Sequence, residues 1–279
     1  MNEQRFIDTA GIIKSRNPAL YRLLPRFVLR WIKQVLHEDE LNEFLNQHAH
    51  DTPGEFVDAS LKRLGVRSKI ISADFEYPAR CIYVANHPLG GPDGLMLMQH
   101  LHRKGIGFKS LSNDLLNHLN PLRPWMIQVN SFGRQSRQFN AEVEAAVGTN
   151  HSLLIFPSGY VSRPYQDGIR DLPWKKTFIQ LSKRLKMDVV PVSIGGISSN
   201  RFLRLARWRK RLGLKANIEM FLLADEMFRL KNKEITIFFH QPIPWQRFND
   251  GQHPLVWARQ IEQSIYERHP NLLHGTHEQ

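Results

Sequence analysis

The spacing of hydrophobic and polar residues changes near residue 65, and this change predicts two structural regions. Before residue 65, apolar residues recur at helical spacing, and no strand-like run is present. After it, short apolar runs alternate with stretches of helical spacing. The apolar runs predict strands at residues 69–72, 81–85, 106–109, 125–129, 152–156, 188–194 and 234–239. The stretches between them predict helices at residues 94–104, 138–147, 174–185, 200–212 and 254–268, while residues 218–230 fit either element.

This alternation predicts an α/β fold with a mixed, largely parallel sheet flanked by helices and preceded by an N-terminal helical layer. We place the boundary between a helical, membrane-associating region, 1–65, and an α/β domain, 66–279. In sheets of this kind, functional sites form in the loops at the carboxyl ends of the strands. The loops that follow the apolar runs are therefore the first places to look for chemistry.

One amphipathic segment stands out in the helical region. Residues 25–36 place apolar side chains on one helical face and basic or polar side chains between them. The apolar set is Phe27, Val28, Trp31, Ile32, Val35 and Leu36, and the polar set is Arg26, Arg30, Lys33 and Gln34. Two interpretations stay open: a helix packed on the domain, or a helix that lies in the headgroup layer of an anionic membrane.

Composition and charge narrow the class of partner. The chain has 279 residues, 42% of them hydrophobic, and carries 38 Lys+Arg against 26 Asp+Glu, a formal charge of +12. Such an excess favours nucleic acid, an anionic membrane surface or an acidic carrier protein as partners. No recognised nucleic-acid motif is present and the basic residues are spread along the chain, so nucleic acid is not expected.

The same sequence predicts where the protein works. No apolar run approaches the ~18–20 residues that span a bilayer, and the N-terminus lacks the basic-then-apolar pattern of a secretory signal. The single cysteine, Cys81, excludes an internal disulfide and suits a reducing compartment. We expect a cytoplasmic protein that is peripheral on the inner face of the cell membrane.

The apolar run 81–85 ends at Asn86-His87, and Asp93 follows after two glycines and a proline. One interpretation is a strand-to-helix turn whose polar residues cap the helix. The other is a histidine base whose second ring nitrogen is held by a carboxylate, which fixes the tautomer and stabilises the imidazolium. Gly90 and Gly91 would let the backbone bring Asp93 back to His87. This stretch alone leaves both interpretations open.

Two further loops follow apolar runs. In Phe156-Pro157-Ser158-Gly159, a tight turn would expose backbone N–H groups, and Arg163 would supply a fork that matches phosphate or carboxylate. The alternative is a plain turn with a surface arginine. In Val190-Pro191-Val192, the proline predicts a bulge or an edge near a pocket. The basic run 201–215 is typical of a solvated helix face, and its aromatic residues would also suit anionic lipid or an acidic carrier protein.

These three loops, in this order, resemble the blocks of the lysophospholipid acyltransferase family, which includes the lysophosphatidic-acid acyltransferases. His87 with Asp93 resembles its His/Asp block, Phe156–Gly159 with Ser162-Arg163 resembles its FPEG block, and Val190–Val192 resembles its late proline block. With the later Asp171-Leu172-Pro173-Trp174, the pattern is most similar to a hemolysin-like bacterial branch that includes ornithine- and glycine-lipid acyltransferases. The resemblance covers about residues 75 to 245.

The resemblance implies a glycerolipid acyltransferase-like fold and the transfer of a fatty acyl chain to a lyso-lipid, either a lysophospholipid or a lyso-amino-acid lipid. The donor would be a thioester of acyl carrier protein or CoA, a co-substrate, with no cofactor and no metal. His87 would act as general base, with Asp93 orienting it. The implied substrate-binding residues are Phe156, Pro157, Ser158, Gly159, Arg163, Arg134 and Arg137.

The sequence departs from the family at three places. Five residues separate His87 from Asp93 where four are usual, Ser158 replaces a glutamate, and Tyr160 stands where the hemolysin-like branch has one. These departures motivate one alternative, a lipid-binding relative without catalysis. Net charge alone motivates the other, a basic nucleic-acid-binding protein.

Overall fold

A seven-stranded sheet forms the centre of the molecule, with strand order β1-β9-β8-β2-β5-β3-β4. In this computed structural model the described residues are 5–112, 119–128, 137–165, 168–196, 199–211 and 222–268. The strands of the sheet are β1 (Arg67–Ser72), β2 (Cys81–Ala85), β3 (Phe108–Ser112), β4 (Met126–Gln128), β5 (Ser152–Ile155), β8 (Asp188–Ile194) and β9 (Glu234–Phe239). A separate antiparallel hairpin is formed by β6 (Arg163–Tyr165) and β7 (Gly168–Arg170).

Every pairing in the large sheet is parallel except that between β8 and β9, where Val192 lies opposite Phe239. Strands β1 and β9 therefore run against the direction of the other five. The prediction of a mixed, largely parallel sheet is confirmed. Because β2 pairs with β5 on one side and β8 on the other, the strand that leads to His87 lies in the middle of the sheet.

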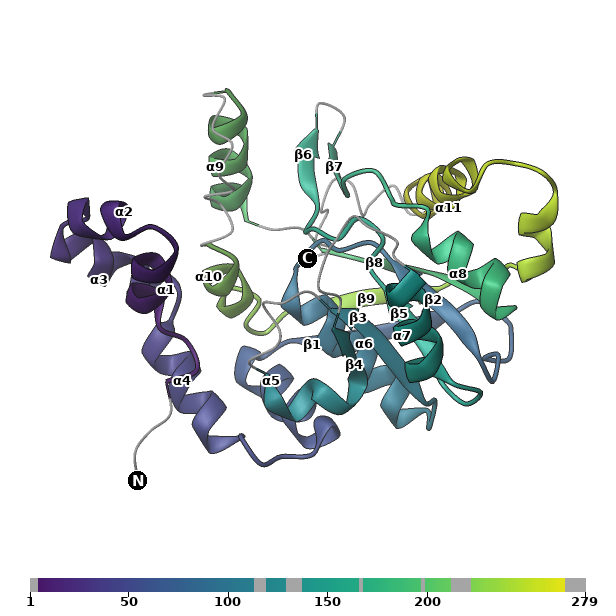
Figure 1. Ribbon diagram of the computed structural model, residues 1–279, viewed down its shortest axis with the longest axis horizontal. Helices are drawn as coiled ribbons and strands as arrows, with labels where there is room; N and C mark the ends of the chain where they lie inside the picture. Colours follow the sequence, from purple (N-terminus) through teal and green to yellow (C-terminus); the bar gives the residue numbers. More distant parts are fainter. Residues whose placement is uncertain are drawn as a thin grey trace.

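Eleven α-helices are described, and they cover both faces of the sheet and extend beyond it (Figure 1). Their bounds are α1 (Thr9–Arg16), α2 (Pro18–Leu23), α3 (Arg26–Val35), α4 (Glu38–Gln47), α5 (Pro53–Leu64), α6 (Gly91–Arg103), α7 (Arg137–Val147), α8 (Thr177–Leu185), α9 (Asn200–Arg211), α10 (Leu223–Phe228) and α11 (Pro254–Arg268). Two 3₁₀ helices span Asn120–Trp125 and Trp245–Asn249.

The core has two apolar layers because successive side chains of a strand point to opposite faces. In β2, Tyr83 belongs to the layer shared with α5 and α6, whereas Ile82 and Val84 belong to the layer shared with α7, α8 and α11. All five residues of β2 are buried. A strand covered on both faces is apolar at every position, which is the continuous run that the sequence shows.

The predicted bounds agree with the structure for β2, β8, β9 and α11, and β3 lies two to three residues later than predicted. The β6–β7 hairpin was not predicted, because its residues lack the apolar alternation of a half-buried strand. Within the ambiguous segment 218–230, residues 223–228 form α10, and residues 218–221 lie outside the described residues.

Pro191 lies in an interior strand, so the edge interpretation was wrong, and the bulge interpretation holds. Val192 pairs with Phe239, and Val189 bridges to Ile243. Between these two pairs, β8 has two residues (190–191) and the opposite chain segment has three (240–242), so the opposite segment carries one extra residue. The Pro191 carbonyl accepts the His240 N–H at 2.9 Å. A ladder that is interrupted at this point needs no donor from Pro191.

Helices α1–α5 precede the first strand, which begins at Arg67. Figure 1 shows α1–α4 standing to one side of the sheet, with α9 and α10 between them and the β6–β7 hairpin. His37 joins this layer to α10, because its ring packs against Phe228 with centroids 4.3 Å apart and its Nε2 lies 3.4 Å from an Asp225 oxygen. The division into two domains at residue 65 stays a prediction. Among the helices that the structure describes, none has the length and apolar character that crossing a membrane requires.

Candidate active site

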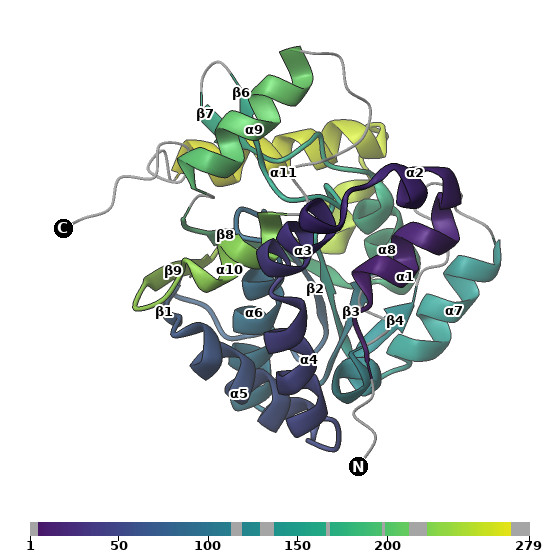
Figure 2. The same cartoon turned by 90° about the vertical axis from the view of Figure 1, so that its left-hand side faces the viewer.

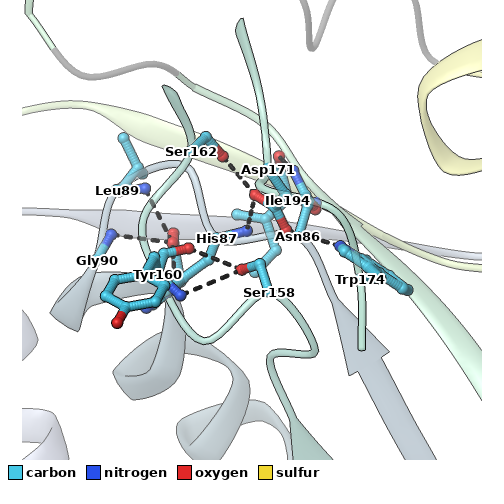
Figure 3. Close-up of polar contacts among 11 residues, drawn as sticks. Asn86, His87, Leu89, Gly90, Ser158, Tyr160, Ser162, Asp171, Trp174 and Ile194 are labelled. Atoms are coloured by element: carbon cyan, nitrogen blue, oxygen red, sulfur yellow. Dashed lines mark hydrogen bonds and ion pairs between the residues drawn. The ribbon is translucent and has the colours of Figure 1, made fainter. Parts of the chain in front are cut away.

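His87 and Asp93 lie in contact where β2 ends and α6 begins. The Nδ1 atom of His87 is 3.0 Å from Oδ2 of Asp93. The same oxygen accepts the backbone N–H groups of Leu89 at 2.9 Å and Gly90 at 3.1 Å (Figure 3). Gly90 has φ 81°, ψ −131°, a conformation that is costly for any residue with a Cβ. This glycine lets the chain turn so that the carboxylate in the first turn of α6 faces back to the histidine.

The pair combines a buried carboxylate with a reachable imidazole. The Asp93 side chain is fully buried, while the His87 side chain is 20% exposed. Burial raises the pKa of the Asp93 carboxyl, and the hydrogen bonds from His87, Leu89 and Gly90 act in the opposite direction. An ionised carboxylate only accepts hydrogen bonds, so in the neutral imidazole the proton sits on Nδ1. Nε2 is then the basic nitrogen.

The loop after β5 lies against the histidine ring. Phe156 stacks on His87 with ring centroids 4.2 Å apart and an interplanar angle of 28°. The turn closes through the Gly159 N–H, which donates to the Phe156 carbonyl at 3.0 Å, and Gly159 has φ 71°. The Pro157 carbonyl accepts the Lys175 N–H at 3.2 Å. Of the sequence-predicted residues, Phe156 thus contacts the histidine, and Pro157 and Gly159 belong to the same turn.

Ser158, at the position of the expected glutamate, is buried and engaged within its own turn. Its hydroxyl donates to the Tyr160 carbonyl at 2.7 Å, and the Tyr160 N–H donates back at 3.4 Å. The Tyr160 side chain is 42% exposed. The serine therefore shapes the turn through backbone contacts, and a partly exposed tyrosine stands where the resemblance led us to expect a carboxylate.

The Arg163 side chain is buried, whereas an arginine that binds a headgroup was expected to be open to solvent. Only 8% of it is exposed, and its guanidinium carbon lies 5.5 Å from the centroid of the Phe202 ring on α9. Arg137 is the first residue of α7, and Arg134 lies outside the described residues. The structure thus brings Arg163 beneath α9, one residue along the chain from Ser162.

The ends of three neighbouring strands are tied together at the site. Ser162 donates its N–H to the His87 carbonyl at 2.8 Å, which joins the loop after β5 to the loop after β2. The Asn86 side chain donates to the Ile194 carbonyl at 2.8 Å and accepts its N–H at 2.7 Å, which joins β2 to β8 (Figure 3). The loops after β2 and β5 therefore meet at the carboxyl end of β8, the strand that contains Val190–Val192.

A second buried carboxylate, Asp171, lies beside the pair and was not predicted as a site residue. It is 1% exposed, and its oxygens accept the His87 N–H at 3.1 Å, the Ser162 hydroxyl at 2.6 Å and the Trp174 Nε1–H at 2.9 Å. Its own N–H donates to the Tyr266 hydroxyl at 2.8 Å. The only hint of Asp171 in the sequence was the stretch Asp171–Trp174, which contributed to the family resemblance. No role was assigned to any of its residues.

Glu262 is linked to Asp171 through Trp174, and its protonation makes the stability of this region depend on pH. Its carboxylate accepts the Trp174 N–H at 3.1 Å. Burial raises the pKa of Glu262 from 4.5 to about 7; the Trp174 N–H opposes this rise and the charge of Asp171 adds to it. The folded state therefore holds a proton that the unfolded chain has lost between about pH 4.5 and 7.

We predict that the free energy of unfolding falls as the pH rises through this window, because the folded state binds more protons than the unfolded state there. Glu262→Gln should remove this contribution, so the stability of the wild type minus that of the variant declines from pH 4.5 to 7 and is flat above. Urea unfolding at closely spaced pH values measures the difference. Glu267→Gln, an exposed change on the same helix, is the control, and an equal slope in Glu262→Gln and wild type would contradict the prediction.

Across the described ranges, no group of three or more His, Cys, Asp or Glu side chains is arranged to hold a metal ion. What the arrangement offers chemically is a basic Nε2 on an oriented imidazole, next to an aromatic ring and a tight turn. Such a group can take a proton from a hydroxyl and return it to a leaving group.

The chain is similar to several known proteins. A family model described as acyltransferase matches residues 11–262. A lyso-glycine lipid O-acyltransferase from Bacteroides thetaiotaomicron is 39% identical over 264 residues, covering 94% of this chain and 97% of that protein. One from Phocaeicola vulgatus is 38% identical over 263 residues, covering 94% of both. The crystal structure of the 1-acyl-sn-glycerophosphate acyltransferase PlsC from Thermotoga maritima aligns over 92% of this chain and 91% of its own, with 15% identity and a TM-score of 0.46.

Proposed function

Because the chain belongs to the acyltransferase family and is an acyltransferase, we propose that it moves a fatty acyl chain from an acyl thioester to the hydroxyl of a lyso-lipid. The observation that carries the proposal is the His87–Asp93 pair, whose Nδ1–Oδ2 contact of 3.0 Å directs a basic Nε2 away from the carboxylate. His87 is the proposed general base and Asp93 the residue that orients it.

The proposed reaction follows from this geometry. Nε2 of His87 takes the proton of the acceptor hydroxyl as its oxygen attacks the thioester carbonyl carbon. Asp93 stabilises the imidazolium that results. As the tetrahedral intermediate collapses, the carbon–sulfur bond breaks and the imidazolium returns the proton to the leaving thiolate. The products are an ester and a free thiol, and the histidine is neutral again.

The proposed acceptor is a lyso-glycine lipid, because two relatives with near-complete coverage carry that substrate in their names. Its glycine carboxylate is an anion that arginine binds well. We assign the acceptor contacts to the loop from Phe156 to Gly159. Its carboxylate partner is proposed among three arginines: Arg163, which must turn from its place under Phe202 to reach the acceptor, Arg134 and Arg137. The donor is a thioester of acyl carrier protein or CoA, both of which are anionic and complement a chain of charge +12.

A basic, aromatic face supports a peripheral position on an anionic membrane. Helix α3 buries none of its residues, and Leu23, Phe27 and Trp31, spaced four apart, are 80%, 69% and 53% exposed beside the exposed Arg26 and Arg30. The apolar residues predicted to share one face of this helix thus differ in exposure: Phe27 and Trp31 are exposed, whereas Val28, Ile32 and Val35 are half-buried. Exposed aromatic and basic side chains in alternation suit the headgroup layer.

Helix α9 adds to the same face of the molecule (Figure 1, Figure 2). Its solvent side carries Arg201, Arg204, Trp208 and Arg211, at i, i+3, i+7 and i+10, and Trp208 is 66% exposed. Its other side buries Phe202 and Leu203, against which Val35 from the end of α3 packs. We propose that α3 and α9 together contact anionic lipid.

The variant Phe27→Gln/Trp31→Gln should bind anionic phosphatidylglycerol vesicles roughly tenfold or more weakly, because two large apolar side chains no longer enter the interface. Vesicle co-sedimentation at fixed ionic strength measures the partition coefficient. Val256→Gln, which changes a 44% exposed apolar residue on α11, should bind like the wild type. Equal partitioning of the double variant and the wild type would remove α3 from the membrane contact.

Lipid profiling tests the proposed function in cells. A strain without the gene should accumulate a lyso-glycine lipid and lose the diacylated form, and wild-type protein should restore it while His87→Ala should not. An unchanged lipid profile, or loss of a different lipid class, would show that the acceptor is another molecule.

A further inference from the structure

Asp171 holds the main chain of His87, whereas Asp93 holds its ring. One Asp171 oxygen accepts both the His87 N–H at 3.1 Å and the Ser162 hydroxyl at 2.6 Å, and the other accepts the Trp174 indole N–H at 2.9 Å (Figure 3). Three donors thus meet one carboxylate that is almost completely buried. Burying a charged carboxylate without hydrogen-bond partners would cost several kcal/mol of stability, so the folded state requires these three contacts.

The contacts form a closed ring around the main chain of His87. Ser162 donates its N–H to the His87 carbonyl at 2.8 Å and its hydroxyl to Asp171, while Asp171 accepts the His87 N–H. Asp171 therefore holds the peptide group before the His87 Cα, and Ser162 holds the one after it. Ser162 and Asp171 are also bonded to each other. Ser162 belongs to the loop that also supplies Phe156, the ring stacked on His87.

We propose that Asp171 is a positioning residue for acyl transfer, which fixes the base to the loop that meets the acceptor. This inference rests on the proposed role of His87. With Asp171 in place, the imidazole and the Phe156–Arg163 loop keep a constant separation, so an acceptor bound by the loop meets Nε2 at hydrogen-bond distance. Transfer is sensitive to that separation, because displacements near 1 Å can cost about 10²-fold in rate.

The substitution Asp171→Asn keeps the shape of the side chain and tests this role. An amide can accept from His87 and Ser162 through its oxygen, but its NH₂ group then faces the Trp174 indole N–H, donor against donor. We expect kcat to fall about 10- to 100-fold and KM to stay within about threefold, because the acceptor-binding loop remains while its alignment with the base is lost.

The pair Asp171→Asn/Trp174→Phe separates positioning from general damage to the core. Removing the indole N–H relieves the clash and lets the amide oxygen accept from His87 and Ser162 without being displaced, so the double variant should regain about tenfold in kcat over Asp171→Asn. Two independent defects in a core would add their losses instead. Glu226→Gln, which changes a buried carboxylate of α10 that accepts from Ser199, is the matched control and should retain wild-type kcat.

The experiment measures kcat and KM with acyl-acyl carrier protein and lyso-glycine lipid in mixed micelles, with melting temperatures recorded for each variant. Wild-type kcat in folded Asp171→Asn, or a double variant slower than the single one, overturns the inference. If Asp171→Asn does not fold, Ser162→Ala takes its place: a three- to tenfold lower kcat at unchanged KM supports the inference, and wild-type kcat overturns it. His87→Ala is assayed in parallel, because activity there would overturn the proposed function rather than the role of Asp171 alone.

Discussion

Replacing His87 with alanine should lower kcat by about 10³-fold or more while the protein stays folded. The variant loses the group that takes the acceptor's proton and returns it to the thiolate, and general acid–base groups typically contribute 10²- to 10⁴-fold. The His87 side chain is 20% exposed and its main chain is held independently by Asp171 and Ser162. The melting temperature should therefore change by only a few degrees.

This prediction is checked by single-turnover transfer from a labelled acyl thioester, together with circular dichroism and thermal unfolding. His102→Ala, an exposed histidine at the other end of α6 that packs on Trp125, is the control and should keep wild-type kcat. A folded His87→Ala protein that transfers acyl chains at the wild-type rate would mean that another group is the base.

Asp93→Asn should lower kcat by about 10²- to 10⁴-fold, the second large effect. The amide oxygen can still accept the N–H groups of Leu89 and Gly90, so the turn into α6 keeps its shape. The same oxygen can still accept from Nδ1 of His87, so the ring stays oriented, but the negative charge that stabilises the imidazolium is lost. KM should change little, because Asp93 is fully buried and does not reach the acceptor.

The comparison with Asp93→Ala separates charge from structure. Alanine leaves two buried N–H groups without their acceptor, which costs about 1–3 kcal/mol each, so this variant should lose stability as well as kcat. Asp93→Asn should lose mainly kcat. If Asp93→Asn retained wild-type kcat, the carboxylate would serve only as a cap of α6, which is the plain interpretation of the NHPLGGPDG stretch.

Sequence patterns predicted the centre of the fold well because its strands show either a continuous apolar run or a regular alternation. Strand β2 is apolar at every position and β8 is buried at all but its first, whereas β9 alternates exposed and buried residues, and both patterns mark the bounds of a strand. The His87–Asp93 contact could also be foreseen, since the two residues are close in sequence and a glycine allows the turn. The β6–β7 hairpin carries no apolar periodicity and was missed.

The rest of the site depends on contacts between distant parts of the chain. Asp171 meets a main-chain group 84 residues away, and Tyr266 reaches it across 95 residues. No local pattern specifies such contacts. The burial of Arg163 under Phe202 likewise depends on how α9 packs on the hairpin, which hydrophobic spacing does not determine.

The most direct test of the central claim is a transfer reaction with purified wild-type protein, a long-chain acyl-acyl carrier protein or acyl-CoA, and a panel of lyso-lipids, followed by mass spectrometry. We predict that thioester is consumed with lyso-glycine lipid present and that the product has the mass of the acceptor plus one acyl chain, joined through an alkali-labile ester. Binding of the lyso-lipid without consumption of either thioester would contradict the account.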